Sequence, residues 1–147
     1  MKIAIACDHG ALELKNALVG RLNGQGHEVK DFGTHTLDSC DYPVFAAAAA
    51  KAVASGECEK GIVLCTTGIG ISIAANKVKG IRCALLSDVK SAELTRLHND
   101  TNMMALGAGM TGEILALEIV DTWLGTEFSG EARHQRRIDL MMALEND

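Results

Sequence analysis

The sequence predicts an α/β fold: a three-layer αβα sandwich, with a Rossmann-like five-stranded parallel sheet and helices on both faces. Short apolar runs alternate with longer segments of helical spacing along the chain. The central run, Ile62-Val63-Leu64, is apolar throughout, as expected of a strand buried on both faces. A chain of 147 residues can bury a core without disulfides or metal, so we expect one domain spanning residues 1–147.

The first half of the chain supplies two strands, a helix and a loop. Ile3–Cys7 is the first expected strand. Leucines then recur at helical spacing over Leu12–Leu22, and Gly24-Gln25-Gly26 ends this helix. His27–Phe32 is a second, more polar strand, and a polar loop over Gly33–Tyr42 follows it.

The alternation continues to the end of the chain. Pro43, the only proline, is well placed to open an alanine-rich helix that runs to Ala54. After the central strand, a helix is expected over Ile71–Lys77. The remaining strands are expected at Ile81–Leu86 and Met103–Leu106, and the remaining helices at Val89–Leu97, Glu113–Leu124 and Arg133–Leu144. Such alternation predicts parallel strands joined by right-handed crossovers.

Composition excludes several classes of protein. The net charge of -5, without a clustered Lys/Arg stripe, argues against nucleic acid as a partner. The opening MKIAIACDHG is too short an apolar run for a signal peptide, and no run approaches membrane-spanning length. Five cysteines, an odd number without a Cys-x-x-Cys pair, indicate reduced thiols. We therefore expect a cytoplasmic protein with no membrane or nucleic-acid partner.

A glycine turn follows the central strand. Cys65 stands where the strand should end, Thr66 to Gly70 form a turn of mostly small residues, and a helix begins after it. A strand, a turn and a helix start in this order place free backbone N–H groups and the positive end of a helix dipole around one point. This arrangement is suited to hold an anion, or to stabilise one that forms during a reaction.

Three known motifs fail at this turn. The dinucleotide fingerprint requires glycine at position 73, where Ile73 stands. A P-loop requires Lys-Ser/Thr where Ile71-Ser72 stands, and a Cys-x5-Arg phosphatase loop requires arginine at position 71. With these three motifs excluded, the interpretation that remains is a cysteine beside an anion-binding turn. An ordinary α/β turn with a buried thiol remains the other interpretation of this stretch.

Polar residues follow several strands at their carboxyl ends. In parallel α/β sheets these ends line the ligand site, so Asp8-His9, Cys65–Thr67 and Ser87-Asp88 are expected to gather on one edge. A cysteine at a helix N-terminus favours the thiolate form, which serves as nucleophile or base. For a base, the matching reaction is proton abstraction beside a carbonyl, with the backbone N–H groups of residues 68–72 stabilising the enediolate oxygen.

Three further side chains suit the same chemistry. His98 precedes a polar run at the end of a helix, and we expect it near the same edge as an acid or base. Arg133 and Arg137 lie four apart on one face of the last helix, as a phosphate clamp requires. Each has an ordinary alternative, since histidines at helix ends usually cap and arginines at this spacing usually face solvent.

The segment from Cys65 to Lys77, Cys-x-Thr-Gly-x-Gly-x-Ser-Ile-Ala-Ala-Asn-Lys, resembles the ribose-5-phosphate isomerase B family, which includes the galactose-6-phosphate isomerase subunits. Further matching pieces run in order from Lys2 to Arg137: Cys7-Asp8-His9-Gly10, Asp41-Tyr42-Pro43, Gly80-Ile81-Arg82, His98-Asn99-Asp100-Thr101-Asn102, Asp121-Thr122-Trp123-Leu124 and Arg133-His134-Gln135. The resemblance implies an aldose–ketose isomerase of sugar phosphates, by default ribose 5-phosphate, in the pentose phosphate pathway.

The resemblance also implies roles for residues. Cys65 would be the base that moves a proton between carbons 1 and 2, because Ile71 stands where members lacking the cysteine have Glu. Thr67 and His98 would open the cyclic sugar. The other implied substrate contacts are Asp8 and Tyr42 on sugar hydroxyls, Asn99 and the loop Thr66, Gly68, Ile69, Gly70, Ile71 and Ser72 around the enediolate, and His9, Arg133 and Arg137 on the phosphate.

The family shares each site between two subunits, with the last-helix arginines coming from the partner. The resemblance therefore implies a homodimer, with tetramers left open, and no metal or organic cofactor. Two departures bear on the substrate: Thr66 replaces the usual glycine, and Gly109 replaces an arginine of the phosphate site. A tetrulose 4-phosphate, allose or galactose 6-phosphate, or an unphosphorylated sugar remain alternatives. So do a non-catalytic sugar-phosphate-binding subunit and a cysteine hydrolase.

Overall fold

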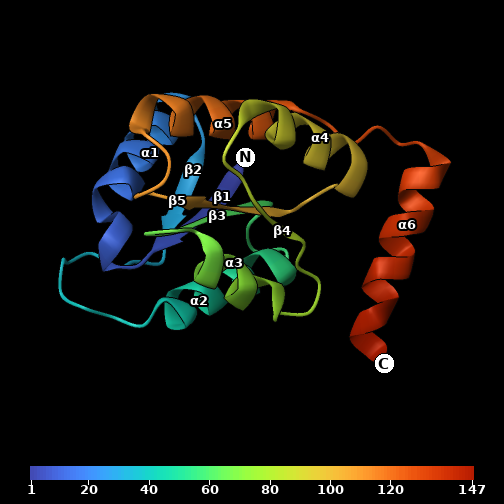
Figure 1. Ribbon diagram of the computed structural model, residues 1–147, viewed down its shortest axis with the longest axis horizontal. Coiled ribbons are helices and arrows are strands. Elements are labelled where there is room, and N and C mark those ends of the chain that lie inside the picture. Colours follow the sequence, from blue (N-terminus) through green and yellow to red (C-terminus); the bar gives the residue numbers. More distant parts are fainter.

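The computed structural model describes residues 1–147 and contains a five-stranded parallel sheet (Figure 1). Its order is β2-β1-β3-β5-β4, and every neighbouring pair is parallel. The strands are β1 Lys2–Cys7, β2 Glu28–Asp31, β3 Lys60–Cys65, β4 Cys83–Leu85 and β5 Met103–Gly107. The helices are α1 Leu12–Gly24, α2 Tyr42–Ala54, α3 Ile69–Asn76, α4 Val89–Asn99, α5 Glu113–Gly125 and α6 Ala132–Ala143. Short 3-10 turns occupy His9–Ala11 and Leu144–Asn146.

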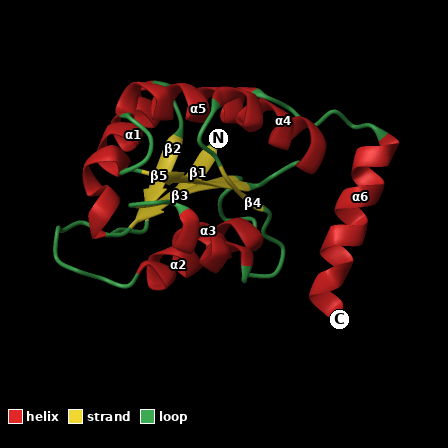
Figure 2. Cartoon of the chain, in the orientation of Figure 1, coloured by secondary structure: helices red, strands yellow, loops and turns green.

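Helices cover both faces of the sheet (Figure 2). The α1, α4 and α5 helices lie on one face and α2 and α3 on the other, whereas α6 stands to the side near α4 (Figure 1). The predicted fold class is confirmed. None of the helices is both long and apolar enough to cross a membrane.

Side chains of β3 alternate between two buried clusters. Ile62 and Leu64 join the core under α1 and α5, and Val63 and Cys65 join the core under α2 and α3. Because β3 is the central strand, both clusters pack against it. The alternation directs the Cys65 side chain toward the α2–α3 layer.

A buried cation holds the loop beside the end of β1. Lys15 of α1 is fully buried, and its Nζ lies 2.8 Å from Asp31 Oδ2 and donates to the Thr34 carbonyl at 2.6 Å. A buried charge is stable only when paired and hydrogen-bonded, so this cation fixes the loop that follows β2. Burial also raises the pKa of the neighbouring Cys7 thiol to about 11, so Cys7 remains a protonated core residue.

The element boundaries differ from the expected ones at two places that matter for the site. The α3 helix begins at Ile69, two residues earlier than expected, because Gly68 adopts a left-handed conformation (φ 76°) that caps it. The β4 strand covers only Cys83–Leu85 at the edge of the sheet.

Candidate active site

The sulfur of Cys65 lies against the start of α3. The backbone N–H of Gly68 donates to Cys65 Sγ at 3.1 Å. A Cβ at Gly68 would lie 2.6 Å from Leu85 Cδ1 and 2.8 Å from the Leu106 carbonyl carbon, so only glycine fits this turn. The tight turn therefore aims an amide dipole at the sulfur, an arrangement that stabilises negative charge there.

Only some amides of the turn remain free for a ligand. Ile69 N–H donates to Thr67 Oγ1 at 3.2 Å, and Ser72 N–H donates to the Gly68 carbonyl at 3.2 Å. The N–H groups of Gly70 and Ile71 have no partner within the chain. The anion hole therefore contains fewer free N–H groups than the five, of residues 68–72, that the sequence predicts. The side chain of Ile71 is buried and cannot contribute to it.

The β1 end and the start of α2 bring further predicted residues to this edge. The Asp8 carboxylate accepts Gly10 N–H at 2.9 Å beside the end of β1. His9 Nδ1 accepts the Cys40 N–H at 3.3 Å, which leaves Nε2 to carry the proton. The Tyr42 ring lies so close to α3 that a Cβ on Gly70 would be 2.5 Å from its Cζ. Asp8 and Tyr42 thus flank the turn that follows Cys65.

The Ser87-Asp88 segment has a structural role. Asp88 is the N-cap of α4, and its carboxylate accepts Ser91 N–H at 2.6 Å. The hydrogen bonds from Ser91 lower the pKa of this carboxyl. Asp88 therefore stabilises the first turn of α4.

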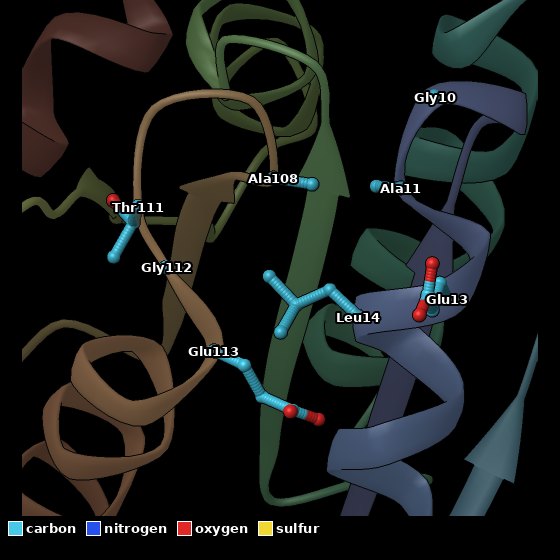
Figure 3. Close-up of a pocket in the computed structure, with 8 residues that line it drawn as sticks. All are labelled: Gly10, Ala11, Glu13, Leu14, Ala108, Thr111, Gly112 and Glu113. Carbon is cyan, nitrogen blue, oxygen red and sulfur yellow. The ribbon is translucent and has the colours of Figure 1, made fainter.

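A pocket of about 250 Å³ lies on the α1–α5 side of the β3 end (Figure 3). Figure 3 shows Ala11 and Ala108 pointing toward each other there, with the Leu14 side chain extending into the space between α1 and the segment from Ala108 to Glu113. None of the predicted site residues lines this pocket. It is separated from the α2–α3 layer, toward which Cys65 is directed, by the sheet itself.

The remaining predicted residues form a second cluster at the other edge of the sheet. His98, Asn99, Arg133 and Arg137 line one pocket of about 380 Å³. The α4 helix runs back to the amino ends of the strands, where Arg82, the residue before β4, donates to the Asn99 carbonyl at 3.0 Å. The expectation that His98 lies on the Cys65 edge is therefore wrong within one chain, because a crossover helix ends at the edge opposite to its start.

Two contacts hold the start of α6 beside His98. Buried Arg96 donates to the Thr126 carbonyl at 3.0 Å, and Ser129 N–H donates to the Leu97 carbonyl at 3.3 Å. These bonds tie the α5–α6 connection to the end of α4. Arg133 and Arg137 consequently share one pocket with His98.

His134 also belongs to this cluster, although the sequence assigned it no role beyond its place in the matching piece Arg133-His134-Gln135. Its ring centroid lies 4.6 Å from that of His98, and Ser129 Oγ lies 2.8 Å from its Nδ1. The signal was present in the spacing, because His134, Ile138 and Met141 recur as one stripe of a helix and all line the pocket. Burial, and then the nearby His98, lower the pKa of His134.

This pKa shift predicts a pH-dependent stability. Because the folded-state pKa lies below the ordinary value near 6.5, His134 contributes stability that is complete above that value and is lost as pH falls through the folded pKa. We expect the melting temperature to fall on acidification from pH 7 to pH 5.5, and we expect that fall to be smaller in His134→Gln. Thermal unfolding at fixed protein concentration measures it, with the exposed His35→Gln as control. If the melting temperature fell equally with pH in the wild type, His134→Gln and His35→Gln, the prediction would be contradicted.

Comparison with known proteins places this geometry in a family. The model of the family described as Ribose/Galactose Isomerase matches residues 3–141. The chain belongs to the ribose/galactose isomerase family. Members of the ribose/galactose isomerase family are aldose–ketose isomerases, so the chain is an enzyme of this class.

Several relatives in the family are similar along nearly the whole chain. Ribose-5-phosphate isomerase B of Escherichia coli is 49% identical, covering 98% of this chain and 96% of its own length. A galactose-6-phosphate isomerase subunit of Clostridium acetobutylicum is 40% identical, covering 100% and 86%. The solved Clostridium thermocellum ribose-5-phosphate isomerase B superposes with a TM-score of 0.97 at 51% identity, covering 99% of this chain and 98% of that one. The Mycoplasma genitalium enzyme, solved with bound ribulose-5-phosphate, gives 0.95 at 38% identity, covering 99% and 97%.

Proposed function

We propose that this chain interconverts ribose 5-phosphate and ribulose 5-phosphate through a cis-enediolate, with Cys65 as the base. The observation that carries the proposal is the turn after β3, where the Gly68 amide points at Cys65 Sγ and the next amides, of Gly70 and Ile71, remain free. The names of the relatives support the substrate, since ribose-5-phosphate isomerases B are 49% and 51% identical to this chain.

The proposed chemistry uses the thiolate twice. The Cys65 thiolate takes the proton from carbon 2 of the open-chain aldose, and the bond electrons move toward the carbonyl oxygen on carbon 1. The free amides of Gly70 and Ile71 stabilise the enediolate oxygen. The Cys65 thiol then returns its proton to carbon 1, while the hydroxyl proton on oxygen 2 moves to oxygen 1, which gives the ketose. Cys65 thus carries the proton between the two carbons, and the second proton passes from oxygen 2 to oxygen 1 within the substrate.

The other site residues bind and open the sugar in this proposal. Asp8 and Tyr42, which flank the turn, hold sugar hydroxyls, and His9 donates from Nε2 to the phosphate. Thr67 and His98 open the ring, and Asn99 contacts the enediolate. Arg133 and Arg137 bind the phosphate by charge-assisted hydrogen bonds.

In this proposal the two halves of the site meet between two chains. Cys65 lies at the carboxyl edge of the sheet, whereas His98 and the arginines lie at the amino edge. A homodimer that places α6 of one subunit against α2 and α3 of its partner brings the halves together twice, by two-fold symmetry.

Apolar residues support this pairing. Leu140, Met141 and Leu144 are exposed at the end of α6, and Val44, Ile69 and Ile73 are exposed on α2 and α3. Exposed apolar patches of this kind mark association surfaces. The proposed dimer buries both patches beside the two half-sites. The interface that joins the subunits therefore also brings the residues of each active site together.

A substrate panel tests the proposal directly. The purified chain, in buffer with a chelator, is assayed for carbonyl migration with erythrose 4-phosphate, ribose 5-phosphate, allose 6-phosphate, galactose 6-phosphate and free ribose. We expect ribose 5-phosphate to give the highest kcat/KM, and free ribose at least about 100-fold less, because it cannot use the arginine contacts. Turnover of none of these compounds would favour a non-catalytic sugar-phosphate-binding subunit and contradict the proposal.

A further inference from the structure

Thr66 occupies the space between the ends of three strands. It follows Cys65 at the end of β3, and its side chain is exposed. A Cβ on Gly10, just after β1, would collide with the Thr66 hydroxyl, and a Cβ on Gly109, just after β5, would lie 3.0 Å from Thr66 Cγ2. The two glycines therefore leave the room that Thr66 fills.

The backbone around Thr66 is fixed. Gly109 N–H donates to the Thr66 carbonyl at 2.8 Å, and Ala108 N–H donates to the Cys65 carbonyl at 2.9 Å. A Cβ on Gly107 would lie 2.5 Å from the carbonyl carbon of Thr67, so the two turns touch backbone to backbone. The backbone that carries the Thr66 side chain is consequently held in place by the end of β5.

The hydroxyl of Thr66 is free and lies beside Asp8. Unlike the Thr67 hydroxyl, which accepts Ile69 N–H, it is hydrogen-bonded to no other group of the chain. Asp8 Oδ1 lies 3.3 Å from the position of a Cβ on Gly10, the same position that the Thr66 hydroxyl overlaps. The Thr66 hydroxyl, a donor, and the Asp8 carboxylate, an acceptor, thus lie beside the same small volume where the ends of β1 and β3 meet.

We propose that Thr66 determines the substrate class: it selects open-chain aldose phosphates of five carbons or fewer over six-carbon 6-phosphates. This inference rests on the proposed function, in which Cys65 fixes the reacting carbons and His9 fixes the phosphate. Thr66 lies between them, because it follows Cys65 and touches Gly10, the neighbour of His9. A six-carbon sugar phosphate that is bound at one end by Cys65 and at the other by His9 must bend outward between them. The Thr66 methyl group occupies the space into which its middle carbons would bend. Its hydroxyl binds a middle sugar hydroxyl together with Asp8.

Three variants separate the methyl group from the hydroxyl. We expect Thr66→Gly to raise the kcat/KM for allose 6-phosphate relative to ribose 5-phosphate about tenfold, the usual scale for one or two carbon atoms in a pocket. Thr66→Ser, which removes only the methyl group, should raise the same ratio severalfold. Thr66→Val keeps the volume and loses the hydroxyl, so it should lower kcat/KM for ribose 5-phosphate roughly tenfold and leave the ratio unchanged.

The outcomes distinguish this inference from the proposed function. If the wild-type chain turns over none of the sugar phosphates, the proposed function fails before any variant is compared. If the wild type isomerises ribose 5-phosphate but Thr66→Gly leaves the ratio unchanged, only the role of Thr66 is overturned. Should Thr66→Gly unfold, as judged by its melting temperature, Thr66→Ser decides the question, and an unchanged ratio in that variant overturns the inference equally.

Discussion

Cys65→Ala is expected to lower kcat for ribose 5-phosphate by roughly a thousandfold, the usual scale for a general base. The reason is that no other side chain at the turn replaces the sulfur: Ile71 is buried in the core and Ser72 Oγ donates to the Ile69 carbonyl at 2.7 Å. The fold should survive, because the sheet and both clusters require no sulfur at this position. Steady-state kinetics and circular dichroism measure the two effects.

A matched control is available in the same chain. Cys83 is a half-buried thiol in β4 that does not line the pocket of His98, Arg133 and Arg137, so Cys83→Ala should keep wild-type kinetics. Cys65→Ser tests the chemistry more narrowly, since a hydroxyl keeps the size but is a far weaker base at neutral pH. Wild-type turnover in Cys65→Ala would rule out the sulfur as the base.

Arg137→Ala is expected to lower kcat/KM for ribose 5-phosphate by roughly fiftyfold, because it removes a charge-assisted hydrogen bond to the phosphate. Arg137 lines the pocket that contains His98, whereas Arg136 does not, so Arg136→Ala serves as the control with the same loss of charge. Both arginines are exposed, and neither change should affect folding.

Mixing two impaired variants tests whether the site is shared. In a heterodimer of Cys65→Ala and Arg137→Ala, one site carries both changes and the other carries neither. After subunit exchange we expect the mixture to recover about a quarter of wild-type activity, since half of the dimers are mixed and each has one intact site. Mixtures of each variant with itself should gain nothing. A mixed sample that stays inactive, although exchange is verified by mass, would show that each site is built within one chain.

The sequence predicted the layers of the fold because apolar residues recur at regular spacing in its strands and helices. The apolar runs around Ile5 and Ile62 and the leucine stripe of α1 lie where they were expected. Cys65 and Asp8 were placed correctly at one edge, because the carboxyl ends of parallel strands must meet there.

The placement of His98 could not be obtained in the same way. It ends a crossover helix, and such a helix carries its last residues to the opposite edge of the sheet. Sequence spacing indicates which face of α4 the His98 ring occupies, but not which edge of the sheet that end of the helix reaches. His134 was passed over for a similar reason, since its neighbour His98 is distant in the sequence and becomes a contact only through the Arg96 and Ser129 bonds.

The central claim is that one site contains Cys65 of one chain and His98 of another. The most direct test is a crystal structure of the Cys65→Ala protein, which accumulates substrate, with ribose 5-phosphate bound. We predict that carbon 2 lies within about 4 Å of the methyl group that this substitution leaves in place of the thiol, with the phosphate against Arg137 of the partner subunit, as a near-attack arrangement requires. A sugar phosphate bound wholly within one chain, or seated in the pocket between α1 and α5, would contradict the account.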